Sequence, residues 1–313
     1  MRTDVVIIGC GLVGGMTAKY LRKQGLEVVV VDDENLMSGS KCSFGVWKEG
    51  WVNKVIKEEY KDGKDLLDEF GGGITETEFI IKPKPYKSRS MVDKYIVKKT
   101  LKREIFNHVH CELIMKELLV VRGKVDSIEG NRVTVIKNKK DKEVIVAKLI
   151  VVAAGVWTTD ILLENGLNID LPYLDFQWGS VFRLKGLDLP LENQLREWSP
   201  YKHSLYFRTS FNTAIFGDGV TVKNPKENDE RLKVNSDRIL IHMGELLGSR
   251  KYGGNIVDIQ EGYRPYLNKE KTMTGKFVNR HSDWVISATG GAKNSVVLCG
   301  HMAKEVWRLF KKG

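Results

Sequence analysis

The residues of this chain best suited to bind a ligand are three glycines near its start. They are spaced as G-x-G-x-x-G after an apolar run at residues 5–8. In such a turn the first glycine permits a tight bend, the second lets the backbone approach a pyrophosphate, and the third lets a helix pack closely on the strand. Backbone N–H groups and the helix dipole then face the phosphates. The predicted phosphate contacts are Gly9, Gly11, Leu12, Val13 and Gly14.

An acid completes this pattern at the end of a second apolar run, residues 28–31. Asp32 stands about twenty residues beyond the glycines, where a carboxylate accepts hydrogen bonds from the ribose hydroxyls of a dinucleotide. Its neighbour Asp33 is a rival for the same role. A lone glycine motif is weak evidence, but here strand, glycines, a helix at residues 16–23, second strand and acid follow in order. The pattern therefore predicts a βαβ unit that binds a dinucleotide.

Three later segments combine small residues with glycine, which lets the backbone lie close to a bound ligand. The first, residues 38–45, is a serine-rich loop, and the second, residues 149–157, ends a fully apolar strand. The third, residues 285–295, is a strand and glycine turn that enters a helix predicted at residues 296–310. Between the last two, Arg264 stands beside a rigid proline. Its planar guanidinium suits a ligand carboxylate. An arginine that instead pairs with a structural acid of the protein would look the same in the sequence.

Charge makes an anionic partner plausible without requiring one. The chain has 50 Lys and Arg residues against 40 Asp and Glu residues, a net charge of +10. The excess is densest at residues 82–103, where Tyr86 and Tyr95 are interleaved. Phosphate contacts with aromatic stacking would produce this pattern, and so would the solvated face of a helix, which we predict at residues 97–109. The predicted nucleic-acid contacts are Lys82, Lys84, Lys87 and Arg89.

Several classes of protein are disfavoured by the rest of the composition. No apolar run approaches the roughly 20 residues that span a bilayer, and a signal peptide does not fit the N-terminal strand and glycine turn, so we expect a soluble cytoplasmic protein. The four cysteines are scattered without a C-x-x-C pair, which argues against a disulfide framework. His108, His110 and Cys111 match no familiar zinc spacing, so no metal is predicted.

The elements that must position these residues change character along the chain. A helix is predicted at residues 53–70, a strand at 74–81 and a hairpin within 118–135, followed by half-buried strands at 179–184, 204–208 and 213–216. This pattern predicts an α/β fold with two interleaved domains. The nucleotide-binding domain comprises residues 1–50, 92–170 and 257–313, and the substrate domain comprises residues 51–91 and 171–256.

Taken in order, these motifs resemble those of flavoprotein amine oxidases of the D-amino acid oxidase and glycine oxidase group, over essentially the whole chain. The resemblance implies a Rossmann-like FAD-binding domain with an interleaved antiparallel-sheet substrate domain. It implies noncovalent FAD, with Cys42 and Cys299 as the two cysteines that could reach the flavin region. The implied cofactor contacts are Gly9, Gly11, Leu12, Val13, Gly14, Asp32, Asp33, Ser40, Lys41, Cys42, Ala154, Gly155, Trp157, Gly291, Lys293 and Asn294.

The same resemblance implies oxidation of a C–N bond, with hydride passing from the α-carbon to flavin N5. Arg264 matches the arginine that grips the substrate carboxylate, and Tyr263 and Tyr206 are candidate substrate contacts. One branch of the family, the flavin domain of the tRNA wobble-uridine modification enzyme, treats a glycine unit on a base as its substrate. An N-substituted glycine is therefore expected, either free or carried by DNA or RNA. The alternatives are an oxidase of free glycine, sarcosine or a D-amino acid, a nicotinamide-dependent dehydrogenase, and a non-catalytic nucleotide-binding protein.

Overall fold

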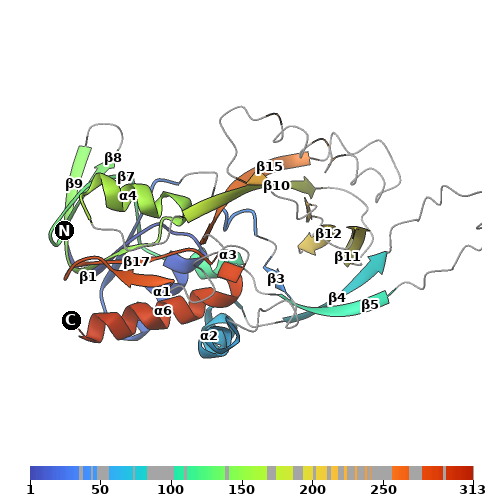
Figure 1. The fold of residues 1–313 in the computed structure, drawn as a ribbon, viewed down its shortest axis with the longest axis horizontal. Helices are drawn as coiled ribbons and strands as arrows, with labels where there is room; N and C mark the ends of the chain where they lie inside the picture. The colour runs from blue at the N-terminus through green and yellow to red at the C-terminus, as the bar shows by residue number, and fades with distance from the viewer. Residues whose placement is uncertain are drawn as a thin grey trace, which may run out of the picture. The chain divides into compact units, whose positions relative to one another are not determined.

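Figure 1 shows a computed structural model of the protein. The residues that it describes are 1–34, 38–43, 45–47, 56–72, 75–82, 102–108, 111–137, 141–167, 174–185, 193–199, 202–209, 213–217, 222–223, 230, 237, 240, 256–267, 277–291 and 294–312. The chain divides into two compact units that alternate along the sequence. Unit 1 comprises Met1–Thr75, His108–Gln177 and Gly262–Gly313, and unit 2 comprises Glu76–Asn107 and Trp178–Glu261.

The centre of unit 1 is an eight-stranded sheet whose main path runs β16-β17-β9-β1-β2-β6. Strand β1 pairs in parallel with β2 and β9, while β17 is parallel to β9 and β6 is parallel to β2. A hairpin of β7 and β8 extends the sheet through an antiparallel pairing of β8 with β9. The strands are β1 (Arg2–Ile8), β2 (Val28–Asp32), β6 (Val120–Arg122), β7 (Lys124–Glu129), β8 (Arg132–Lys137), β9 (Asp141–Val152), β16 (Val278–Arg280) and β17 (Val285–Ala288).

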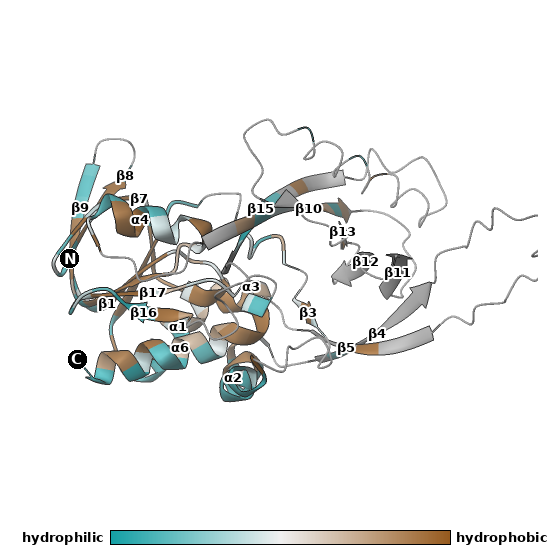
Figure 2. Cartoon of the chain, viewed as in Figure 1, coloured by the Kyte–Doolittle hydropathy of each residue, from teal (hydrophilic) through white to brown (hydrophobic). Residues whose placement is uncertain are grey.

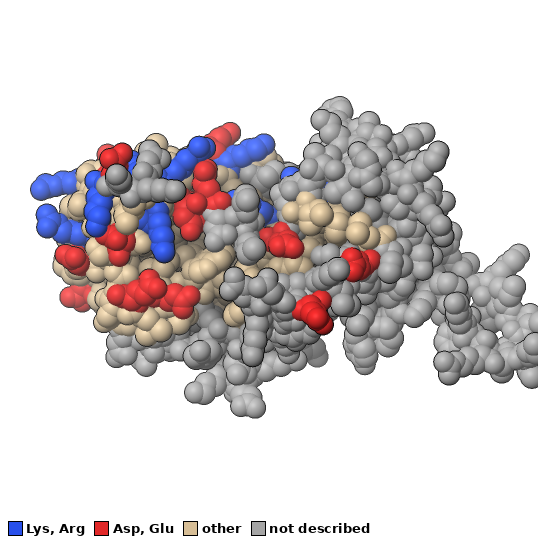
Figure 3. All heavy atoms as spheres, turned by 90° about the horizontal axis from the view of Figure 1, so that it is seen from above, with Lys and Arg blue, Asp and Glu red and all other residues tan. Residues whose placement is uncertain are grey.

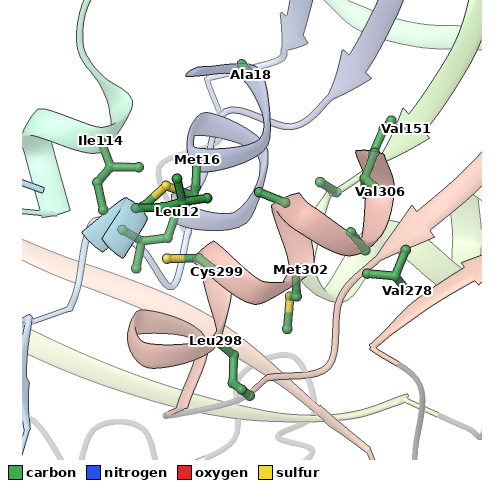
Figure 4. Close-up of a cluster of buried hydrophobic side chains, with 14 of the residues drawn as sticks. Leu12, Met16, Ala18, Ile114, Val151, Val278, Leu298, Cys299, Met302 and Val306 are labelled. Atoms are coloured by element: carbon green, nitrogen blue, oxygen red, sulfur yellow. The ribbon is translucent and has the colours of Figure 1, made fainter. Parts of the chain in front are cut away.

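The central strands are continuous runs of apolar residues because both faces of the sheet are covered. Alternate residues enter two separate cores: Ile7 and Val30 belong to the one that contains helices α1 and α6, whereas Ile8 and Val31 belong to the one that contains α4. Figure 4 shows the first core, in which side chains of α1 and α6 meet. The helices of unit 1 are α1 (Leu12–Lys23), α2 (Lys57–Phe70), α3 (Cys111–Met115), the 3-10 turn η3 (Gly155–Trp157), α4 (Thr158–Glu164) and α6 (Ser295–Lys312).

Helix α6 is two-sided, with hydrophobic residues toward the core and hydrophilic ones elsewhere (Figure 2). Its Gly300 lies so close to Gly63 of α2 that a Cβ on either residue would overlap the backbone of the other helix. Asp62 adds hydrogen bonds to His301 at 2.8 Å and to Arg308 at 2.9 Å. The described residues 56–72, which we predicted in the substrate domain, fall in unit 1 of this division.

Unit 2 is built on a largely antiparallel sheet, as predicted. Strands β14, β10, β13, β12, β11, β4 and β5 follow one another, and β15 pairs with β10. The pairings β10–β13, β12–β13 and β11–β12 are antiparallel, and β11 is parallel to β4. The strands are β4 (Thr75–Lys82), β5 (Lys102–His108), β10 (Leu174–Lys185), β11 (Asn193–Ser199), β12 (Lys202–Thr209), β13 (Thr213–Gly217), β14 (Val222–Lys223) and β15 (Ile256–Leu267). Strands β10 and β15 each continue from one unit into the other along the chain.

The helix predicted at residues 97–109 is wrong within the described residues, because Lys102–His108 forms strand β5 beside β4. The described residues 102–107, which we predicted in the nucleotide-binding domain, fall in unit 2 of this division. The spacing of basic residues suggested a helix, but pairing with the neighbouring strand β4 determines the conformation of this short, mostly polar segment. No helix in the described part of the chain is long and apolar enough to cross a membrane.

Candidate cofactor and substrate site

The glycine turn joins β1 to α1 at the carboxyl edge of the unit 1 sheet. Gly9 adopts a φ of +103°, and a Cβ there would lie 2.5 Å from the carbonyl oxygen of Ala153. A Cβ on Gly14 would overlap the carbonyl oxygen of Gly9. Helix α1 has no acidic residue in its first turn and no side-chain cap at Gly11. The positive end of its dipole therefore has no carboxylate of its own helix to oppose an anionic ligand.

The carboxylate of Asp32 lies against this turn. One oxygen accepts a hydrogen bond from the backbone N–H of Cys10 at 2.5 Å, and the other accepts one from Glu34 at 2.7 Å. An ionised carboxylate has about four lone-pair sites, so each oxygen can accept a further bond, such as one from a ribose hydroxyl. The rival Asp33 has an exposed side chain. The structure thus places Asp32, rather than its neighbour, beside the glycines.

Cys10 within the turn keeps its proton at neutral pH. Burial raises the pKa of its thiol to about 11, and the negative charge of Asp32 contributes in the same direction. A neutral thiol at this position adds no negative charge to a phosphate site. Cys10 therefore contributes a small uncharged side chain, while its backbone N–H holds the Asp32 carboxylate in place.

The serine-rich loop reaches the same helix terminus. The Ser40 hydroxyl accepts a hydrogen bond from the backbone N–H of Leu12 at 2.9 Å. It lies directly over Gly11, where an added Cβ would come within 2.9 Å of the Ser40 oxygen. Backbone hydrogen bonds from Lys41 to Ser38 and from Ser43 to Ser40 hold the loop in a turn. Glycine at position 11 is what allows this loop to approach α1.

The second glycine segment follows β9, beside β1. Ala153 donates its N–H to Ile8, and Gly155 then turns the chain at a φ of +62°. The hydroxyls of Thr158 and Thr159, just beyond Trp157, are buried and have no hydrogen-bond partner. Buried hydroxyls are rarely left in this state, because each costs free energy until it is paired. Both hydroxyl oxygens are covered by the protein itself, so we do not count these threonines among the cofactor contacts.

The third segment closes the site from β17 and α6. The hydroxyl of Thr289 donates to the carbonyl oxygen of Gly155 at 3.1 Å, which ties this segment to the second one. Asn294 donates its N–H to Gly291 at 2.8 Å at the start of α6. Thr289 was not predicted, and the only sequence signal for it is its place just before the glycine pair. Lys293 lies outside the described residues.

Arg264 stands on β15, packed against the serine-rich loop. Ser38 forms a parallel bridge with Tyr263, and a Cβ on Gly39 would come within 3.4 Å of the Arg264 Cγ. Burial lowers the pKa of the Arg264 guanidinium, and the nearby Cys42 thiol partly offsets this. No carboxylate in the described part of the chain pairs with this guanidinium. The structure therefore contains a half-buried cation next to the loop that also contacts α1.

Other predicted site residues are not seen next to the glycine segments or Arg264. Tyr206 belongs to β12 of unit 2 and Lys82 to β4, and the side chains of both lie outside the described residues. Lys84, Lys87 and Arg89 lie wholly outside them. The described residues contain no group of three metal-ligating side chains. Cys42 and Cys299 are buried free thiols, and burial raises the pKa of Cys299 within α6.

These features fit a dinucleotide. The glycine turn offers the N-terminus of a helix, the Ser40 hydroxyl can donate a hydrogen bond, and Asp32 can accept one from a ribose. The four glycine-containing segments meet at the carboxyl ends of parallel strands, where nucleotides bind in sheets of this kind. These hydrogen-bond donors and the acceptor suit a ligand that contains phosphate and sugar.

Two family models match the sequence. One, described as FAD dependent oxidoreductase, matches residues 108–309, more than half of the chain. The chain belongs to this family of FAD-dependent oxidoreductases. The other, described as Pyridine nucleotide-disulphide oxidoreductase, matches residues 3–172, which contain the glycine turn and Asp32. The four cysteines of the chain are free and include no C-x-x-C pair, so the disulphide in that description has no obvious counterpart here.

Individual relatives support the same fold. Glycine oxidase from Bacillus cereus ATCC 14579 superposes with a TM-score of 0.65 at 16% identity, over 99% of this chain and 95% of that one. L-proline dehydrogenase from P. horikoshii gives a TM-score of 0.68 at 16% identity, over 100% and 94%. Digeranylgeranylglycerophospholipid reductase 1 from Methanosphaera stadtmanae is 41% identical over 56 residues, 17% of this chain and 14% of that protein. The chain thus spans only a small part of this curated relative. The predicted fold, FAD as cofactor and the oxidoreductase class are confirmed.

Proposed function

We propose that this enzyme oxidises the C–N bond of a glycine-type amine, an N-substituted glycine, and that Arg264 binds the carboxylate of the substrate. The observation that carries the proposal is the half-buried Arg264, which packs against the serine-rich loop and pairs with no described carboxylate. A partly buried cation loses hydration, and an anionic ligand offsets that loss. A carboxylate suits the planar guanidinium because it accepts two parallel charge-assisted hydrogen bonds.

The chain's own residues divide this work between binding and positioning. Gly9, Ser40 and Asp32 hold the cofactor at its phosphates and ribose, while Arg264 fixes the substrate by its carboxylate. FAD, when bound, supplies the two-electron acceptor for the hydride of the α-carbon. Fixing a substrate at one end aligns its reacting carbon, which converts binding energy into rate without a dedicated general base. This agrees with the absence of a catalytic triad pattern in the sequence.

The related folds support this choice of substrate class. Glycine oxidase and L-proline dehydrogenase are named for amino acids, which have a carboxylate on the carbon that bears the amine. At 16% identity these likenesses establish the fold of this chain and not its substrate. They make an amino-acid-like substrate the first to test. Oxidation of free glycine, sarcosine or a D-amino acid is the alternative within the same proposal.

In the finer form of the proposal, the glycine is carried on a modified base of nucleic acid. The net charge of +10 favours this form, because lysine and arginine contacts to phosphates dominate such binding. On the described surface in Figure 3, basic and acidic side chains are interspersed. A cytoplasmic location is also part of the proposal, and the four free cysteines agree with a reducing compartment.

The test is the flavin absorbance of the purified enzyme, followed without oxygen as amines are added. The amines are glycine, sarcosine, a D-amino acid, and a glycyl-modified pyrimidine as nucleoside and within an oligonucleotide. Bleaching by glycine-type amines supports the proposal, and bleaching only by the base-linked glycine supports its finer form. A flavin that none of these amines bleaches would refute it.

Variants of Arg264 sharpen this test. Losing one hydrogen bond to a charged group costs about 1.5–3 kcal/mol, so Arg264→Met should raise KM for a carboxylate substrate by about 10- to 100-fold or more. Arg264→Lys keeps the charge but loses the fork, and we expect an intermediate effect. Arg132→Lys, at an exposed position on β8, is the matched control and should leave KM unchanged.

A further inference from the structure

Tyr263 and Arg264 are neighbours on strand β15, so their side chains point to opposite faces of it. The face of Arg264 packs against the serine-rich loop. Gly262, two residues away and on that same face, lies so close to the loop that a Cβ there would come within 2.9 Å of both the Cys42 sulfur and the Ser38 carbonyl oxygen. Only one of the two faces can therefore serve the substrate carboxylate, and Tyr263 is on the other.

The Tyr263 ring is held between two aromatic side chains from different elements. Trp157 of η3 lies edge-on to it, with ring centroids 6.3 Å apart and planes at 87°. Phe176 of β10 meets it at 5.4 Å and 82°. Both are the edge-to-face geometry that aromatic pairs prefer. These contacts involve the ring, and they fix β15 from the side opposite to Arg264.

We propose that Trp157, Tyr263 and Phe176 form an aromatic clamp that positions Arg264, and that Tyr263 acts through its ring and not as a substrate contact. The inference rests on the proposed role of Arg264 in binding a carboxylate. It also changes the role expected for Trp157, which we predicted to contact the cofactor. In this proposal its indole supports Tyr263, and the cofactor is contacted by the backbone of Ala154 and Gly155.

The clamp and the loop act on one short stretch of backbone. Ser38 bridges Tyr263, and Gly39 approaches both the Tyr263 carbonyl oxygen and the Arg264 side chain, so the loop holds one face of β15 while the clamp holds the other. Without the ring of Tyr263 the strand loses support on one side only. The guanidinium would then remain present and charged, but it would be misplaced by an amount that weakens bidentate binding.

The experiment measures binding of acetate and of its neutral analogue acetamide to the FAD-loaded enzyme, from the change that each causes in the flavin spectrum. The ratio of the two affinities isolates the contribution of the carboxylate. Tyr263→Phe keeps the ring and should leave this ratio within about twofold of the wild type. Tyr263→Leu removes the ring and should lower the ratio about tenfold, the loss expected when the misplaced guanidinium forms one charge-assisted hydrogen bond fewer. KM for the amine substrate should rise by a similar factor, with kcat changed much less.

Phe176→Leu provides a second route if Tyr263→Leu does not load FAD, because it removes one of the two pairs and should lower the ratio by a smaller factor. A Tyr263→Phe enzyme that loses as much as Tyr263→Leu would overturn the inference, since the hydroxyl would then be the contact. Unchanged ratios in both leucine variants would also overturn it. A wild type without acetate preference, together with an unaffected Arg264→Met variant, would instead refute the proposed function itself.

Discussion

Replacing Ser40 by alanine tests whether the serine-rich loop completes the cofactor site. The hydroxyl of Ser40 accepts the Leu12 N–H at 2.9 Å, which uses a lone pair and leaves its own proton free to be donated. A pyrophosphate at the α1 terminus is the acceptor that we expect for that proton. A hydrogen bond to a charged group contributes about 1.5–3 kcal/mol, so Ser40→Ala should raise the dissociation constant of FAD by about 10- to 100-fold.

The assay is titration of the FAD-free protein with FAD, followed by the quenching of flavin fluorescence. Ser43→Ala is the matched control, because its hydroxyl belongs to the same loop but accepts the N–H of Gly45 at 3.2 Å and the thiol of Cys111 at 3.8 Å. We expect less than about a threefold change for this control, since only weaker neutral hydrogen bonds are lost. Equal affinities for wild type and Ser40→Ala, or an equal loss in both variants, would refute this account of the loop.

Two further predictions concern the contact between α2 and α6. Gly300→Ala gains about 1 kcal/mol of helix propensity, but its Cβ would overlap the backbone of Gly63, which costs about 1–3 kcal/mol or more. The variant should therefore unfold at lower urea concentration, and an unchanged or raised midpoint would contradict the packing. Burial raises the pKa of Asp62, but hydrogen bonds from Arg308 and His301 outweigh this and lower it. Asp62 thus stabilises the fold above the unfolded-state pKa of about 3.9, so the stability lost in Asp62→Asn should be largest near neutral pH and vanish as the pH falls through the folded-state pKa. A difference independent of pH would contradict it.

The parts predicted well from sequence are those fixed by local rules. The glycine turn needs a positive φ at Gly9 and bare backbone at Gly14, and both requirements appear as residue types within six positions. Asp32 is marked by the end of an apolar run, because a parallel strand that is buried on both faces must stop where it becomes polar. Local signals of this kind are enough to locate the cofactor end of the site along the chain.

The errors arose where long-range packing decides. The amphipathic pattern of α2 predicts a helix but does not say which surface covers its apolar face, and it is the close approach of Gly63 to Gly300 that puts α2 in unit 1. Strand β5 was taken for a helix because basic residues at helical spacing are equally compatible with a strand that pairs with a neighbour. Thr289 was missed because a single hydroxyl residue has no pattern in the sequence, and only its hydrogen bond to Gly155 across the site reveals it.

The serine-rich loop links cofactor and substrate binding physically. Ser40 contacts the terminus of α1, while Ser38 and Gly39, two positions and one position earlier, contact Tyr263 and Arg264. A shift of this loop by the width of a methyl group would therefore disturb both ends of the site. For this reason glycine occupies positions 39 and 262, where any side chain would separate the loop from the strand. Substitutions at either position should weaken FAD binding and carboxylate binding together, whereas Arg264 variants should affect only the carboxylate.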